Sequence, residues 1–238
     1  MKYGLLLCFL TLFFAGKEVS ARTRKAGHTT ITVTDPARGQ RKIPVEIWYP
    51  EEIEEKDHPP AGEGKPLTVI VFGHGYMLAP GSYRHLVELV VPEGCVVAFP
   101  LAERGMFPSH RRLAEDLAVV AGQVASWNGE HGSLFYGRLS ETVCLMGHSM
   151  GGGAAVLAAA MEPRIKGLAL LAPYDTRPSA IEAACGVSCP TLVIAGSTDG
   201  SFHLFTRQKE NIPALSDDPQ PGQPGAGFQE EGPEKTIS

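Results

Sequence analysis

A serine held between glycines is the residue of this sequence best placed to do chemistry. Gly147-His148-Ser149-Met150-Gly151 matches the pattern G-x-S-x-G and stands between an apolar, strand-like segment and an alanine-rich, helix-like segment. In such a strand-turn-helix setting the glycines relieve crowding in a strained turn that exposes the serine hydroxyl. We therefore interpret Ser149 as a nucleophile, and the alternative is a plain glycine-rich turn.

A second glycine-containing segment, Gly73-His74-Gly75-Tyr76, follows an earlier apolar run. Attack of a serine on an ester carbonyl creates an oxyanion, which enzymes with this kind of turn bind through two backbone N–H groups. The amide of Met150, directly after the serine, is one expected donor, and the amide of Tyr76 is the other. The alternative for this segment is a glycine turn with a core histidine.

A carboxylate is needed to hold a catalytic imidazole in one tautomer and to stabilise its charged form. Asp199 follows the apolar segment 191–195, and Asp175 follows the apolar segment 168–171. Both aspartates therefore come after predicted strands, and the chain order serine, aspartate, histidine is compatible with either of them. The local pattern leaves both open as the acid.

The base is the least clear part of the pattern. The only histidine after Asp199 is His203, which lies four residues further on in the same predicted loop. A triad histidine must reach both the serine and the acid and usually comes from a separate loop, which argues against His203. The remaining histidines are interpreted as members of the glycine turns or as structural or exposed side chains: His28, His58, His74, His85, His110, His131 and His148.

The sequence around these residues alternates between strand-like and helix-like segments. Apolar or alternating runs predict strands at residues 29–34, 43–49, 67–72, 96–99, 142–146, 168–171 and 191–195. Helices are predicted at 83–90 with Ser82 as cap, after a second cap at Ser109, at 150–161 and at 179–184. This alternation predicts the α/β class: a mostly parallel sheet with a hairpin at one edge and helices on both faces. Ligands bind such sheets beyond the carboxyl ends of the strands.

With these motifs in place, the sequence resembles secreted α/β-hydrolases of the group that contains poly(ethylene terephthalate) hydrolases, bacterial cutinases, chlorophyllases and dienelactone-hydrolase-like proteins. The resemblance is carried by VIVFGHGY, LMGHSMGGG, LALLAPYD and PTLVIAGSTD and runs from about Gly27 to Asp199. It implies the α/β-hydrolase fold and carboxylic esters as substrates. The site residues that it implies are Ser149 as nucleophile, Asp199 as acid, Tyr76 and Met150 as oxyanion-hole donors, and Tyr174 as an aromatic beside the scissile ester.

The resemblance ends where the C-terminal part of the chain begins. Members of this group continue after the acid through a helix, a last strand and a loop with the catalytic histidine, whereas residues 216–238 here are rich in proline, glycine and acidic residues. That composition predicts a disordered tail. We therefore expect an α/β-hydrolase domain at 22–215 that lacks the last strand. Three readings stay open: an active serine esterase, a catalytically silent binding protein of this fold, and a truncated product without the triad histidine.

The first 21 residues have the order of a signal peptide, with a positive start, an apolar run at 5–14 and small residues at 19–21. The run is too short to span a bilayer, and no second apolar run approaches that length. The chain is therefore expected to mature at Arg22 and to be secreted.

The composition narrows the range of partners. The chain has 238 residues, of which 43% are hydrophobic, and this suits one globular domain. Its net charge of -5 does not suggest nucleic acid or an anionic membrane as a partner. A small-molecule or polymer ester is the expected substrate. No cofactor is implied, because acyl transfer by serine requires none. No cysteine or histidine pair with zinc-ligand spacing stands next to a second such pair, so a structural metal is not expected either.

Two further expectations concern the cysteines and access to the site. Cys95 and Cys144 lie inside apolar runs and are expected in the core, while Cys185 and Cys189 are spaced so that a small disulfide loop is possible but not required. The stretch between the predicted strand at 168–171 and the predicted helix at 179–184 is too short for a long helical cap. An open cleft is therefore expected.

Overall fold

The computed structural model describes residues 26–51 and 65–196 of the chain. The predicted signal peptide at 1–21, the predicted tail at 216–238 and the expected absence of a last strand all lie outside the described residues. So do His58, Asp199 and His203.

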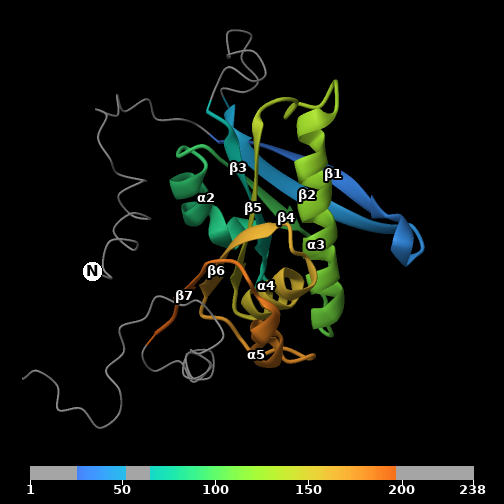
Figure 1. Cartoon of the computed structure of the whole chain (residues 1–238), viewed down its shortest axis with the longest axis vertical. Helices are drawn as coiled ribbons and strands as arrows, with labels where there is room; N and C mark the ends of the chain where they lie inside the picture. Colours follow the sequence, from blue (N-terminus) through green and yellow to red (C-terminus); the bar gives the residue numbers. More distant parts are fainter. Residues whose placement is uncertain (1–25, 52–64, 197–238) are drawn as a thin grey trace, which may run out of the picture.

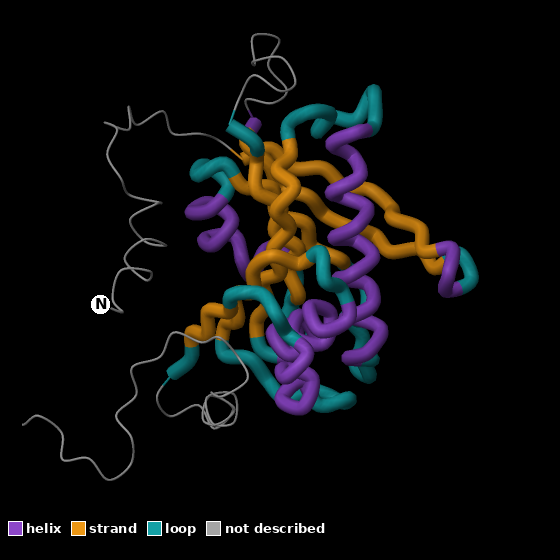
Figure 2. Tube along the Cα trace, viewed as in Figure 1, coloured by secondary structure: helices purple, strands orange, loops and turns teal. Residues whose placement is uncertain are grey.

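A single mixed sheet forms the centre of the described part (Figures 1 and 2). Its order is β1-β2-β4-β3-β5-β6-β7, and the five strands from β4 to β7 in this order run parallel to one another. The first two strands form an antiparallel hairpin at one edge, as predicted. The strands are β1 Ala26–Asp35, β2 Arg41–Pro50, β3 Leu67–Gly73, β4 Cys95–Pro100, β5 Leu139–His148, β6 Ile165–Leu171 and β7 Thr191–Ile194.

Helices cover both faces of this sheet, which confirms the predicted α/β class. Helices α3 (His110–Ser126) and α4 (Met150–Met161) pack on one face over a large apolar core, and α5 (Ala180–Ala183) adjoins α4. The opposite face is covered by α2 (Arg84–Val90), whose Val87 packs with Phe72 and Phe99 of the sheet. Figure 1 shows α2 and α3 on opposite sides of the strands.

Burial explains why the central strands carry no polar alternation. Every residue of β4 is buried, and β3 is buried from Val69 to Gly73, because helices lie over both faces of these two strands. The β-branched run predicted to need two covered faces therefore occupies the centre of the sheet. Its position brings the carboxyl ends of β3 and β5 together in the middle of one sheet edge, with Gly73 paired to Gly147.

The two predicted helix caps have different outcomes. Ser109 caps α3, and its hydroxyl accepts a hydrogen bond from the Arg112 amide at 3.3 Å, as expected. The prediction that Ser82 caps α2 is wrong, because Ser82 lies inside a 3-10 turn at Pro80–Tyr83 and its amide already donates to Ala79. The helix begins one residue after that turn, and Tyr83 occupies its cap position.

A group of buried charges ties the hairpin to α3. Asp116 on α3 is fully buried and accepts hydrogen bonds from Arg38 at 2.6 Å and from Arg41 at 2.8 Å. Asp35 also pairs with Arg38, and Glu103 in the loop after β4 pairs with Arg41 at 2.9 Å. Buried charges are tolerated when they are paired in this way, and this set connects three separate segments of the chain.

Cys95 and Cys144 were expected in the core, and a disulfide between Cys185 and Cys189 was left open. Cys95 is buried and Cys144 half-buried, and burial raises the pKa of each thiol to about 11, as for an unreactive core thiol. Cys189 is a free, buried thiol, so the possible disulfide with Cys185 is absent. Burial also raises the pKa of the Cys189 thiol.

Candidate active site

Ser149 stands in a strained turn between β5 and α4. Its φ of 52° and ψ of -121° lie in a region that residues with a side chain rarely adopt. Neighbouring strand ends hold it there: its amide donates to Leu171 at 2.9 Å, and its carbonyl accepts from Gly152 at 2.9 Å and from Tyr174 at 3.0 Å. The side chain is half-buried rather than enclosed in the core. The predicted turn is therefore present.

The glycines of the motif are required by close backbone contacts. A Cβ atom placed on Gly147 would lie 2.3 Å from the carbonyl oxygen of Gly151, which is far shorter than any real contact. One placed on Gly152 would lie 3.0 Å from Pro173. The sharp turn from β5 into α4 therefore requires glycine at 147 and 152, because a side chain at either position would clash with neighbouring backbone.

The predicted oxyanion-hole donors lie on adjacent strand ends. The segment after β3 forms a turn in which Leu78 donates to Gly75 at 3.1 Å and Met77 has a φ of 55°. Tyr76 lies in this turn, next to the strand end that pairs with the end of β5. Met150 is the first residue of α4, and the first amides of a helix have no acceptor within the helix. Their roles as donors stay predictions.

Two exposed tyrosines belong to the segments that adjoin the Ser149 turn. Tyr174 follows β6, and its backbone amide donates to the Ser149 carbonyl, which places the Tyr174 backbone beside the serine. The residue is 55% exposed. Tyr76 is 49% exposed and donates from its hydroxyl to the carbonyl of Met106 at 2.8 Å. The roles of both rings as flat, apolar surfaces beside a reacting ester stay predictions.

Asp175 has a structural partner of its own. Its carboxylate accepts hydrogen bonds from the hydroxyl of Ser179 at 3.0 Å and from the amides of Ala180 at 2.8 Å and Ile181 at 3.2 Å. These donors are the free amides at the start of α5 and its cap residue, so Asp175 helps to cap that helix. The local sequence pattern left Asp175 and Asp199 both open as the acid, and the resemblance implied Asp199, which lies outside the described residues.

The described histidines are bonded elsewhere. Both ring nitrogens of buried His74 lie near carbonyl oxygens, at 3.0 Å from Gly75 and 2.8 Å from Ala102. His110 accepts from the Arg177 amide at 2.9 Å, and burial lowers the pKa of its imidazole. Within residues 26–51 and 65–196, no histidine ring hydrogen-bonds to Ser149. The identity of the base therefore stays a prediction.

Tyr83 contacts the site in a way that the sequence did not predict. The hydroxyl of Tyr83 accepts a hydrogen bond from the Gly75 amide at 2.7 Å and lies 3.1 Å from Nδ1 of His148. Tyr83 was expected only as the start of a helix. No local pattern indicates this contact, because Tyr83 and His148 are 65 residues apart.

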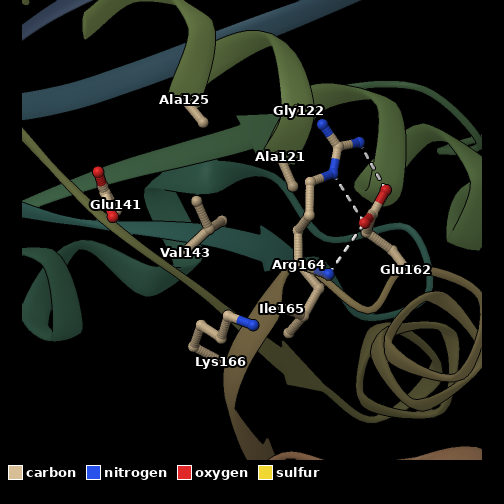
Figure 3. A pocket seen from close by; sticks show the side chains of 9 residues that line it. All are labelled: Ala121, Gly122, Ala125, Glu141, Val143, Glu162, Arg164, Ile165 and Lys166. Atoms are coloured by element: carbon tan, nitrogen blue, oxygen red, sulfur yellow. Dashed lines mark hydrogen bonds and ion pairs between the residues drawn. The ribbon is translucent and has the colours of Figure 1, made fainter.

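The cavity in Figure 3 lies away from these residues. It has a volume of about 140 Å³ and is formed by α3, the first half of β5 and the segment that leads into β6. Arg164 at its rim is held by Glu162 through hydrogen bonds of 2.8 and 2.6 Å, which neutralise its charge. Because β5 and β6 are parallel, this cavity lies toward the sheet edge opposite Ser149, and we assign it no part in the chemistry.

Two further features of the described residues bear on ligands and membranes. No group of three or more histidine, cysteine, aspartate or glutamate side chains within them is arranged to hold a metal ion. None of the helices found there combines the length and the apolar character needed to cross a bilayer.

Comparison with models of known protein families gives a match. The model of a family described as PET hydrolase-like matches residues 56–214, which is more than half of the chain. The matched range contains Ser149, Tyr76, Tyr174 and both candidate acids. A search of curated proteins found no match.

Proposed function

Because this chain belongs to the PET hydrolase-like family of α/β-hydrolases, we propose that it hydrolyses carboxylic esters through an acyl-enzyme on Ser149. The observation that carries this proposal is the backbone of Ser149, held at a φ of 52° between strand β5 and helix α4. Such strain costs on the order of 1–3 kcal/mol and persists where the surrounding structure enforces it, most often at functional sites.

In the first half of the proposed reaction, Ser149 Oγ attacks the ester carbonyl carbon while a base removes the hydroxyl proton. The carbonyl oxygen becomes an oxyanion that accepts hydrogen bonds from the Tyr76 and Met150 amides. The C–O bond to the alcohol then breaks, and the alcohol leaves with the proton that the base returns.

In the second half, water attacks the acyl-enzyme and the base takes a proton from that water. The same two amides bind the second oxyanion, and the bond between the acyl group and Ser149 breaks to release the carboxylic acid. The serine recovers its proton, so no redox partner or cofactor enters the cycle.

We assign the acid to Asp199 rather than to Asp175. Both come after strands in the sequence, but the Asp175 carboxylate is already bonded to Ser179 and to the first amides of α5. A carboxylate occupied by a helix start is poorly placed to orient an imidazole as well. His203 is the one histidine after Asp199 in this sequence. The pair that this assignment proposes is therefore Asp199 as acid and His203 as base.

The substrate is proposed to be a small-molecule or polymer ester that reaches the serine without a lid. Only residues 172–179 separate β6 from α5, and this short connection carries no inserted helix. Exposed Tyr76 and Tyr174 supply apolar surfaces for an acyl or aryl group. We also propose that the chain is secreted after cleavage before Arg22, because its first residues have the order of a signal peptide.

The test is labelling with a fluorophosphonate probe, followed by hydrolysis of p-nitrophenyl acetate. The wild type is expected to be labelled and to release p-nitrophenol, and Ser149→Ala is expected to do neither. Ser140→Ala is a matched control, since Ser140 lies in the same strand as the turn, at the opposite end. Labelling that persists in Ser149→Ala, or a folded wild type that is neither labelled nor active, would rule out the proposed function.

A further inference from the structure

One hydroxyl group lies between the two segments that the proposed reaction uses. The oxygen of Tyr83 accepts a hydrogen bond from the amide of Gly75 at 2.7 Å and lies 3.1 Å from Nδ1 of His148. Gly75 directly precedes Tyr76, and His148 directly precedes Ser149. A single side chain from a third segment therefore contacts both neighbours of the reacting groups.

The position of this hydroxyl is set by aromatic packing. The Tyr83 ring lies against Phe72 of β3 with centroids 4.5 Å apart and against Phe99 of β4 at 6.0 Å. Its edge meets the ring of His148 at 5.8 Å. Because Phe72 and Phe99 are fully buried, the ring cannot shift without disturbing the core on that face of the sheet.

Both side chains of this contact are uncharged near neutral pH. Burial raises the pKa of the Tyr83 hydroxyl, so it stays a neutral phenol with one proton to donate. Burial lowers the pKa of His148, so its imidazole stays neutral at neutral pH, and Nδ1 can accept. The Gly75 N–H donates to the phenol oxygen, and the phenol also hydrogen-bonds to Nδ1 of neutral His148.

Gly75 is closely enclosed at the same point. A Cβ atom placed on it would lie 2.8 Å from Nδ1 of His148, 3.0 Å from Leu78 and 3.2 Å from the Tyr83 hydroxyl. Its carbonyl oxygen also accepts from the Leu78 amide at 3.1 Å. Both backbone polar groups of Gly75 are thus bonded, which fixes the start of the turn that contains Tyr76.

We infer that Tyr83 is a positioning residue for the proposed esterase reaction, because its hydroxyl holds the turn containing Tyr76 at a fixed distance from the turn containing Ser149. This inference rests on the proposed function. An oxyanion hole works only when its donors lie within about 2.7–3.1 Å of the developing charge. A shift of about 1 Å in such a site can cost about a hundredfold in rate.

The main test is Tyr83→Phe, which removes the hydroxyl and keeps the ring. Its matched control is Tyr136→Phe, because the Tyr136 hydroxyl also meets a histidine, His131, at 3.2 Å, but in the exposed segment before β5. For Tyr83→Phe we expect kcat for p-nitrophenyl acetate to fall by about 10- to 100-fold with KM nearly unchanged. The rate of fluorophosphonate labelling should fall in parallel, and Tyr136→Phe should match the wild type.

A second pair of variants tests the other end of the contact. His148→Asn keeps a hydrogen-bonding group close to the place of Nδ1, whereas His148→Leu removes it, so His148→Asn should retain more of kcat. If both side chains act through one hydrogen bond, Tyr83→Phe combined with His148→Leu should be no slower than the slower single variant. Purely additive losses would overturn the inference.

The possible results separate this role from the proposed function. Thermal unfolding is followed for every variant, and kinetics are compared at a temperature where all of them are folded. A reactive wild type with an equally reactive Tyr83→Phe, or with a change in KM alone, would overturn the role of Tyr83 and leave the esterase proposal intact. A wild type that is folded but unreactive toward the probe would overturn both.

Discussion

Gly73 and Gly151 meet backbone to backbone: a Cβ atom added to Gly151 would lie 2.1 Å from the carbonyl oxygen of Gly73. Gly73 ends β3, and Gly151 lies in the first turn of α4. The start of the helix is therefore pressed against the neighbouring strand end, and this contact brings Ser149 close to the turn that contains Tyr76. This close approach is possible only because both residues are glycines.

The first prediction follows from this contact. Gly151→Ala should destabilise the fold by about 1–3 kcal/mol, the range for forcing an added group into a packed site, and should abolish ester hydrolysis. Urea unfolding measures the first effect and p-nitrophenyl acetate the second. Gly81→Ala is the control, because nothing lies within 4 Å of an added Cβ there, and it should change stability by less than about 0.5 kcal/mol. Equal stabilities of the two variants would show that the contact is not tight.

The second prediction separates the two candidate acids. Asp175→Ala should lower stability by about 1 kcal/mol, because α5 loses a capping carboxylate, while kcat changes little. Asp199→Ala should leave stability nearly unchanged and lower kcat by about 10⁴-fold. Thermal unfolding and hydrolysis rates measured on both variants decide the matter. The reverse pattern would make Asp175 the acid.

The third prediction concerns pH and stability. The hydrogen bond from Arg38 lowers the pKa of Asp35 below its ordinary value of 3.8. A carboxylate with a lowered pKa in the folded state contributes stability that is fully present above the unfolded value and is lost as the pH falls through the folded value. Asp35→Asn should therefore destabilise the protein at pH 7 and flatten the loss of stability below about pH 4.

Urea unfolding at several pH values checks this third prediction. Glu88→Gln is the control, because Glu88 pairs with Arg84 on an exposed helix surface where ion pairs contribute little. If the pH profiles of the wild type and Asp35→Asn run parallel below pH 4, the Asp35–Arg38 pair does not contribute to acid stability.

The fourth prediction concerns access to the serine. The short connection between β6 and α5 leaves no inserted cap over Tyr174, which is 55% exposed. Soluble short-acyl esters such as p-nitrophenyl acetate should therefore be turned over below their solubility limit, with a hyperbolic dependence of rate on concentration. A sharp rise in rate only above the micellar threshold of a longer ester would indicate a lid and contradict the prediction.

Local patterns were sufficient for the elements and for the turn around Ser149. Each strand and helix predicted within the described residues is present, because periodicity, capping by Ser109 and the glycines of the turn act between residues close in sequence. The misplaced cap at Ser82 is a small error of the same local kind, since a 3-10 turn precedes the helix.

The sequence by itself therefore determined the α/β class, the hairpin edge and a nucleophile-like Ser149 with glycines at the required spacing. Only the tertiary structure decided the order of the strands, the contact of Gly73 with Gly151, the capping role of Asp175 and the position of Tyr83 between Gly75 and His148. The physical reason is that most of these relationships join segments far apart in the chain. Their geometry depends on how the strands pair and how the aromatic side chains fill the space between sheet and helix, and no local pattern of residues records it.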